Sequence, residues 1–88
     1  FVIQGGGFVW HPDNSLVPLT SRGQIQNEFS VARSNLRGTV AMAKVGGQPN
    51  SATSQWFINM IDNTFLDTNN GGFTVFARVT VPGMAVAE

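Results

Sequence analysis

Residues 51–59 read Ser-Ala-Thr-Ser-Gln-Trp-Phe-Ile-Asn, and the last five of them carry the clearest structural signal in the chain. Side chains of different character alternate there, a pattern typical of a β-strand whose two faces have different neighbours. Trp56 and Ile58 share one face of this strand. Gln55, Phe57 and Asn59 share the other. The pattern predicts a strand over residues 55–59.

Three more segments have the character of strands. They lie at residues 1–5, where an apolar run stops at three glycines, at 39–43, and at 73–80, where the apolar residues from Phe73 to Val81 alternate on one face. A helix should begin near Pro82, because proline suits the first helical turn. Four short strands predict an all-β-dominated fold, an antiparallel barrel or sandwich with an incomplete set of strands, since four strands leave open edges.

The connections between these strands are rich in turn-forming residues. Residues 46–51 and 67–72 are predicted turns, the second because Asn70-Gly71 adopts positive φ angles at low cost. Residues 10–37 contain scattered proline, glycine, asparagine and serine, and we expect them to form a long irregular stretch. Such long loops are uncommon in small domains and are often functional.

Composition excludes several classes of function. Charged residues make up 11% of the 88 residues, against about 25% in ordinary domains, and five basic residues balance five acidic ones. This balance gives no basic surface for nucleic acid or for an anionic membrane, and no apolar run is long enough to span a bilayer. The chain has no cysteine, which excludes disulfides, zinc–thiolate sites and thiol catalysis.

The reactive side chains form no recognisable catalytic or metal-binding pattern. His11 is the only histidine, and the five acidic residues are scattered along the chain, so neither a metal site nor a carboxylate pair is predicted. Gly5-Gly6-Gly7 lacks the spacing of a phosphate-binding loop and is interpreted as a backbone turn or bulge at the end of a strand. We therefore expect no cofactor and no metal.

Three features suggest a binding pocket instead. Gln4 shares a strand face with an apolar neighbour, Gln55 shares one with Phe57, and Phe65-Leu66 is an apolar pair just before a turn. Together they would line an apolar pocket rimmed by amide side chains. The alternative, which composition alone favours, is that Phe57, Phe65 and Leu66 are ordinary core residues.

Several blocks of sequence point to one family. The blocks are Phe1-Val2-Ile3-Gln4-Gly5-Gly6-Gly7-Phe8, Asn27-Glu28, Arg37-Gly38-Thr39-Val40-Ala41-Met42-Ala43, residues 51–59, Phe65-Leu66-Asp67 and Phe73-Thr74-Val75-Phe76. Their order and spacing resemble a cyclophilin-type peptidyl-prolyl cis-trans isomerase of bacterial style, and the resemblance runs over residues 1–88 without a large gap.

The resemblance implies an antiparallel eight-stranded barrel closed at its ends by two helices. Residues 1–88 would form the central part of this single domain, without its first strands, its first helix and its last strand. In the family a catalytic arginine stands a few residues before the position of Phe1. The four arginines of this chain stand in no matching context, so that role is carried over to none of them; they are Arg22, Arg33, Arg37 and Arg78.

The family's other site positions carry over residue by residue. Phe1, Val2, Phe57 and Leu66 match the apolar pocket for the proline ring, with Phe57 at its floor and Trp56 and Ile58 pointing into the barrel. Gln4 matches a glutamine that hydrogen-bonds the substrate backbone, so Gln4 and Phe57 are the expected catalytic pair. Ala43, Lys44 through its backbone, and Gln55 match the groove for the residues before proline.

Two pocket positions depart from the common family pattern. Phe65 stands where some members have tryptophan, including members that bind cyclosporin well. Phe73 stands where histidine or tyrosine is frequent, so a hydrogen bond from that position is lost. We therefore expect cyclosporin-type ligands to bind weakly.

The resemblance implies a monomeric prolyl isomerase that acts on Xaa-Pro bonds in proline-containing peptides and unfolded chains, in the manner of a folding chaperone. The alternative is a non-catalytic module that binds proline peptides in the same groove. Without the family's arginine, residues 1–88 alone should have little activity. Bacterial relatives occur in both cytoplasm and periplasm, and the sequence leaves the compartment open.

Overall fold

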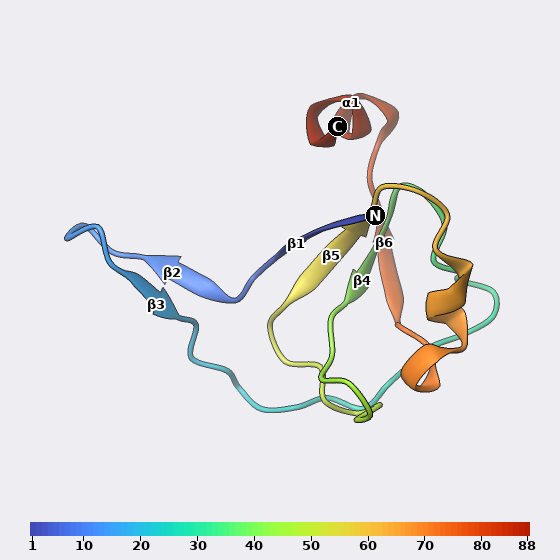
Figure 1. The fold of residues 1–88 in the computed structure, drawn as a ribbon, viewed down its shortest axis with the longest axis horizontal. Coiled ribbons are helices and arrows are strands. Elements are labelled where there is room, and N and C mark those ends of the chain that lie inside the picture. Colours follow the sequence, from blue (N-terminus) through green and yellow to red (C-terminus); the bar gives the residue numbers. More distant parts are fainter.

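A computed structural model describes residues 1–88 as a four-stranded sheet, a projecting hairpin and a short C-terminal helix (Figure 1). The elements in order are β1 (Val2–Gly5), β2 (Phe8–Trp10), β3 (Leu16–Pro18), β4 (Thr39–Met42), β5 (Trp56–Asn59), the 3₁₀ helices η1 (Thr64–Asp67) and η2 (Asn69–Gly71), β6 (Val75–Arg78) and α1 (Val81–Ala87). None of the helices has the length and apolar character needed to cross a bilayer.

The main sheet has the strand order β1-β5-β4-β6, and every neighbouring pair is antiparallel. The sheet does not close into a barrel. The prediction of a sheet-dominated, incomplete antiparallel fold with a helix near the C-terminal end is therefore confirmed. α1 begins one residue before Pro82, and the hydroxyl of Thr80 caps it by accepting a hydrogen bond from the backbone N–H of Gly83 at 3.1 Å.

The predicted strands at 1–5, 39–43 and 55–59 agree with β1, β4 and β5 to within one residue at each end. The fourth, predicted over 73–80, is shorter. Its register against β4 shifts at Phe76, the extra residue of a β-bulge, and a bulge interrupts the alternation of side chains. The single apolar face predicted from Phe73 to Val81 is therefore wrong: Val75 is buried, whereas Val81 is exposed and begins α1.

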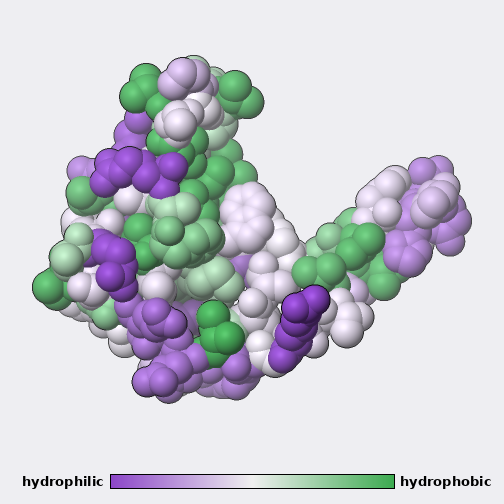
Figure 2. All heavy atoms as spheres, turned by 180° about the vertical axis from the view of Figure 1, so that it is seen from behind, coloured by the Kyte–Doolittle hydropathy of each residue, from purple (hydrophilic) through white to green (hydrophobic).

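Part of the predicted irregular stretch is a β-hairpin. β2 and β3 pair in register, with Val9 opposite Val17, and the chain reverses at Asp13-Asn14, where Asn14 has φ of 65°. The carboxylate of Asp13 accepts hydrogen bonds from the backbone N–H and the hydroxyl of Ser15 and so fixes the turn. The hairpin projects from the body, apolar along its length and hydrophilic at its tip (Figure 2).

The three glycines after β1 form the predicted backbone turn. Gly6 has φ of +84°, a conformation that favours glycine, and a β-carbon there would lie 2.9 Å from the Trp56 side chain. The turn thus lets the chain leave the sheet close to Trp56 and enter the hairpin.

The buried core lies on one face of the sheet. It consists of Ala41, Phe57, Leu66 and Val75, with Leu66 supplied by η1. Phe57 is only 4% exposed and belongs to this cluster, so it is a core residue of the face that also carries the predicted pocket positions. Trp56 and Ile58 lie on the opposite face as predicted, and because the sheet is open, that face is uncovered and Trp56 is 36% exposed.

Candidate functional site

Strand pairing gathers the predicted site residues in rows across the sheet. Gln4 of β1 pairs with Phe57 of β5, and Phe57 pairs in turn with Ala41 of β4. Directly paired residues project to the same face, so these three side chains lie side by side. Val2 pairs with Asn59 in the neighbouring row on the same face. Phe57 therefore lies on the central strand β5, and Gln4 and Val2 lie on the same face of the neighbouring strand β1.

The 3₁₀ segment covers the Phe57 ring. Leu66 packs on it from η1, and the Phe73 ring meets it edge-on, with centroids 5.9 Å apart and planes at 72°. This arrangement suits the charge distribution of two aromatic rings. Phe57 is therefore both a core residue and the inner end of a pocket.

A cavity of about 160 Å³ opens above this ring. Its eight lining residues are Phe1, Val2, Gln4, Ala43, Lys44, Phe57, Leu66 and Phe73. All eight belong to the set that the sequence indicated. The other two members of that set, Gln55 and Phe65, lie beside the cavity.

Gln55 belongs to a second hollow, of about 110 Å³, that adjoins the first. The two share Gln4, Ala43 and Lys44 in their walls. At their boundary the side-chain Nε2 of Gln4 donates a hydrogen bond to Oε1 of Gln55 at 2.7 Å. An extended ligand lying in both hollows would pass these two amides.

Phe65 supports the outer rim of the cavity. It is exposed and stacks on the ring of Phe1, which is also exposed, with centroids 5.8 Å apart and planes at 19°. The two residues of the predicted apolar pair Phe65-Leu66 therefore differ in position. Leu66 is buried against the sheet, whereas Phe65 is exposed and stacks on Phe1.

Lys44 enters the site with its side chain. Its ammonium donates hydrogen bonds to the backbone carbonyls of Asn70 at 2.7 Å and Gly72 at 2.6 Å, and it lies 4.5 Å from the centre of the Phe73 ring. Burial lowers the pKa of this ammonium below its ordinary value, because desolvation disfavours the charged form.

The whole chain, residues 1–88, matches the family described as cyclophilin type peptidyl-prolyl cis-trans isomerase/CLD. The chain belongs to the cyclophilin family. The resemblance inferred from the sequence blocks is thereby confirmed.

Three bacterial members illustrate the relationship. The chain is 42% identical to a peptidyl-prolyl cis-trans isomerase of Acinetobacter baylyi, 41% identical to peptidyl-prolyl cis-trans isomerase A of Dickeya dadantii, and 41% identical to peptidyl-prolyl cis-trans isomerase B of Escherichia coli. Each alignment covers all of this chain and 45%, 44% and 53% of the respective relative. The chain thus spans about half the length of the curated relatives it matches.

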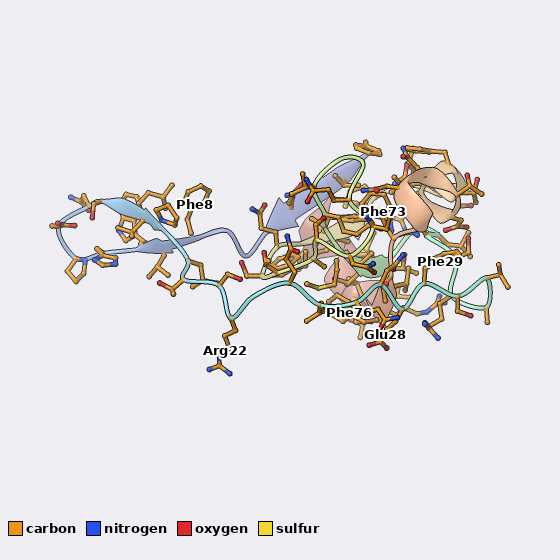
Figure 3. All side chains as sticks on the ribbon, turned by 90° about the horizontal axis from the view of Figure 1, so that it is seen from below. Phe8, Arg22, Glu28, Phe29, Phe73 and Phe76 are labelled. Carbon is orange, nitrogen blue, oxygen red and sulfur yellow. The ribbon has the colours of Figure 1, made fainter.

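No arginine lines the cavity of this cyclophilin chain. The guanidinium of Arg33 donates to the backbone carbonyls of Glu28 and Val75, and Arg37 forms an ion pair with Glu88. Arg22 and Arg78 are exposed, and Arg22 projects away from the body (Figure 3). None of the four arginines therefore reaches the cavity over Phe57.

Sequence reasoning missed a buried group of three asparagines beside the pocket. The side chain of Asn59 donates to Asn35 Oδ1 at 3.1 Å and to the Thr39 hydroxyl at 2.9 Å, and that of Asn63 donates to Asn59 Oδ1 at 2.8 Å. Asn35 and Asn59 are fully buried, and Asn63 is 1% exposed. Such groups are stable inside a protein only when their hydrogen bonds are satisfied, as they are here.

The asparagine group connects to both ends of the pocket. Asn63 Nδ2 donates to the backbone carbonyl of Phe1 at 3.2 Å, and Asn35 Nδ2 donates to that of Phe73 at 3.0 Å. Asn35 also donates to the carboxylate of Asp67, the residue after Leu66. The network thus holds the backbone carbonyls of two pocket residues, Phe1 and Phe73. Its sequence signal was the placement of Asn59 on the same strand face as Phe57.

Proposed function

We propose that the protein is a peptidyl-prolyl cis-trans isomerase acting on Xaa-Pro bonds in peptides and unfolded chains. The observation that carries this proposal is the apolar cavity over Phe57 with the Gln4–Gln55 pair at its rim. Membership of the cyclophilin family supports it.

The cavity suits a proline ring in size and character. Its volume of about 160 Å³ compares with an engineered apolar cavity of about 150 Å³ that takes up benzene, a slightly larger ring. Phe57, Leu66 and Phe73 offer apolar contacts to the ring, and burial of such surfaces provides the binding free energy. The ring would be held while the rest of the peptide stays in the groove.

Isomerisation requires rotation about the peptide bond, with a barrier of about 18–20 kcal/mol. The reaction makes and breaks no covalent bond, so the catalyst only has to bind the twisted amide better than either planar form. In this proposal Phe57 fixes the ring, and the Gln4 amide donates a hydrogen bond to the peptide backbone. The adjoining hollow beside Ala43 and Gln55 holds the residues that precede proline.

The test is a protease-coupled assay on an Ala-Pro peptide with the complete protein that contains this chain. We expect a rate above the uncatalysed one, and a Gln4→Leu variant should lower kcat/KM about 10-fold or more, since removing a donor present in the transition state has effects of this size or larger. Gln26→Leu, an exposed glutamine outside the cavity, is the matched control.

The alternative function is a non-catalytic module that binds proline peptides in the same groove. The same apolar lining would serve it, because binding a proline ring requires apolar contacts and no stabilisation of the twisted amide. Calorimetric binding of the peptide without any increase in the exchange rate would establish this alternative and overturn the proposed activity.

The same proposal includes weak binding of cyclosporin-type ligands and a monomeric state. Phe65 stands at the rim position that carries tryptophan in members that bind cyclosporin well. A Phe65→Trp variant should therefore bind cyclosporin more tightly than the unmodified protein in a fluorescence titration. Equal affinities would contradict this role of Phe65, and light scattering that gave the mass of a dimer would contradict the monomer.

A further inference from the structure

Lys44 is the only lysine in the 88 residues, and its side chain joins two parts of the molecule. Lys44 lies two residues after β4, and its ammonium contacts residues 70–72, the segment that precedes the pocket residue Phe73. There it donates to two backbone carbonyls, of Asn70 and Gly72, at 2.7 and 2.6 Å. Hydrogen bonds from a charged donor are about twice as strong as neutral ones.

The segment that Lys44 holds is a turn with left-handed backbone angles. Asn70, Gly71 and Gly72 have consecutive φ angles of 52°, 76° and 82°. Asparagine and glycine adopt such angles at low cost, so the position of the segment depends on the hydrogen bonds made to it. Besides Lys44, the side chain of Asn27 donates to the carbonyls of Gly71 and Gly72, so two side chains from outside anchor the segment.

The segment leads directly into a pocket residue. Phe73 follows Gly72, its backbone N–H donates to the carbonyl of Leu66 at 3.0 Å, and its ring meets Phe57 edge-on. The Lys44 ammonium also faces this ring, at 4.5 Å from its centre, a geometry in which a cation and an aromatic face attract. A movement of residues 70–72 would therefore displace the pocket wall.

Lys44 also lies where three hollows meet. It lines the cavity over Phe57, the adjoining hollow beside Gln55, and a third of about 210 Å³ that includes Glu28 and Phe76. Lys44 takes part in no ion pair, since the one ion pair of the structure joins Arg37 and Glu88. Its hydrogen-bond partners are backbone carbonyls. Lys44 faces the Phe73 ring and also lines the hollow that includes Glu28 and Phe76.

We propose that Lys44 is a positioning residue of the proline pocket, whose ammonium ties residues 70–72 to the end of β4 and so holds Phe73 against Phe57. Its effect on catalysis rests on the proposed isomerase function. Its effect on the segment and on peptide binding does not.

The test compares Lys44→Met and Lys44→Arg in the complete protein, with Arg22→Met as the control for loss of a positive charge at an exposed site. Hydrogen exchange is measured at the backbone N–H groups of Gly72 and Phe73, together with Kd and kcat/KM for an Ala-Pro peptide. Lys44→Met should speed exchange at these two groups and raise Kd about tenfold, or about 1.4 kcal/mol. Exchange in β5 should stay unchanged. Lys44→Arg should restore most of the affinity, because arginine keeps the charge and the donors.

Three results decide the proposal. Unchanged exchange and Kd in Lys44→Met would overturn it. Faster exchange throughout the sheet would also overturn it, because Lys44 would then serve overall stability. Local loosening and weaker binding in a protein without isomerase activity would support the positioning role and reject the proposed function.

Discussion

The side-chain amides of Gln4 and Gln55 meet at the boundary between the two hollows, where Gln4 Nε2 lies 2.7 Å from Gln55 Oε1. Gln4 belongs to β1 and Gln55 directly precedes β5, so the antiparallel pairing of these strands brings the two together. This hydrogen bond restricts the amide that we assign to the peptide backbone. Gln55 thus has two roles, as a wall of the groove and as a support for Gln4.

Removing that support should lower activity without unfolding the protein. Gln55→Leu deletes the acceptor, and loss of one neutral hydrogen bond, worth about 0.5–1.5 kcal/mol, corresponds to a decrease in kcat/KM of about 2- to 10-fold. Gln55→Glu keeps an acceptor at this position and should lose less. Steady-state kinetics of both variants, with Gln48→Leu as an exposed control, would check this. Equal rates for Gln55→Leu and Gln48→Leu would contradict the supporting role.

Phe57 should matter for stability as well as for binding, because it is both core and pocket. Phe57→Ala should lower the free energy of unfolding by about 3–5 kcal/mol, the usual cost of truncating a buried phenylalanine. Urea denaturation measures this, and Phe8→Ala in the exposed hairpin is the matched control. A cost no larger than that of Phe8→Ala would show that Phe57 is not part of the core.

The asparagine group should be sensitive to single substitutions. Asn59→Ala leaves Oδ1 of buried Asn35 without its Asn59 donor and removes one of two partners from Asn63 Nδ2 and from the Thr39 hydroxyl. Each buried group left without its partner costs about 1–3 kcal/mol. We expect Asn59→Ala to lower the unfolding free energy by at least this amount in urea denaturation, and Gln26→Ala, an exposed amide, to have almost no effect. A tolerated Asn59→Ala would mean that water replaces the lost bonds.

Asp67 should make stability depend on acid pH. Burial raises the pKa of its carboxyl, but the hydrogen bonds from Ser34 and Asn35 together outweigh burial, so its pKa lies below the ordinary value of 3.8. A carboxyl of this kind adds stability that is complete above its unfolded-state pKa and is lost as the pH falls through the folded-state value. Below about pH 4 the unfolding free energy of the unmodified protein should therefore fall more steeply than that of Asp67→Asn. Parallel pH profiles of the two proteins would rule out this linkage.

Much of the site was predictable from the sequence because it lies on regular strands. The alternation in β1 and β5 places Gln4 and Phe57 on specific faces, and the family blocks supply the partners Leu66 and Phe73. The role of the Lys44 side chain was not predictable in this way. It depends on carbonyls 26 and 28 residues further along the chain, and on backbone angles that local sequence does not determine.

The errors in the fold prediction have equally local causes. The hairpin β2–β3 was missed although Asp13-Asn14 stands between two apolar runs, a recognisable turn signal. The bulge at Phe76 could not be foreseen, because it is defined by pairing with β4. Strand alternation separates Phe57 from Trp56 and Ile58, but which of the two faces is covered depends on the position of η1, and alternation does not contain that information.

The central claim is that the cavity over Phe57 accelerates the exchange of Xaa-Pro bonds. The most direct test is NMR exchange spectroscopy on an Ala-Pro peptide with substoichiometric amounts of the complete protein, of Phe57→Leu and of Phe8→Leu. The account predicts cis–trans exchange faster than in the free peptide, which alone takes tens to hundreds of seconds. It also predicts that Phe57→Leu loses most of this acceleration and that Phe8→Leu retains it. Exchange as slow as in the free peptide, or equal acceleration by both variants, would contradict it.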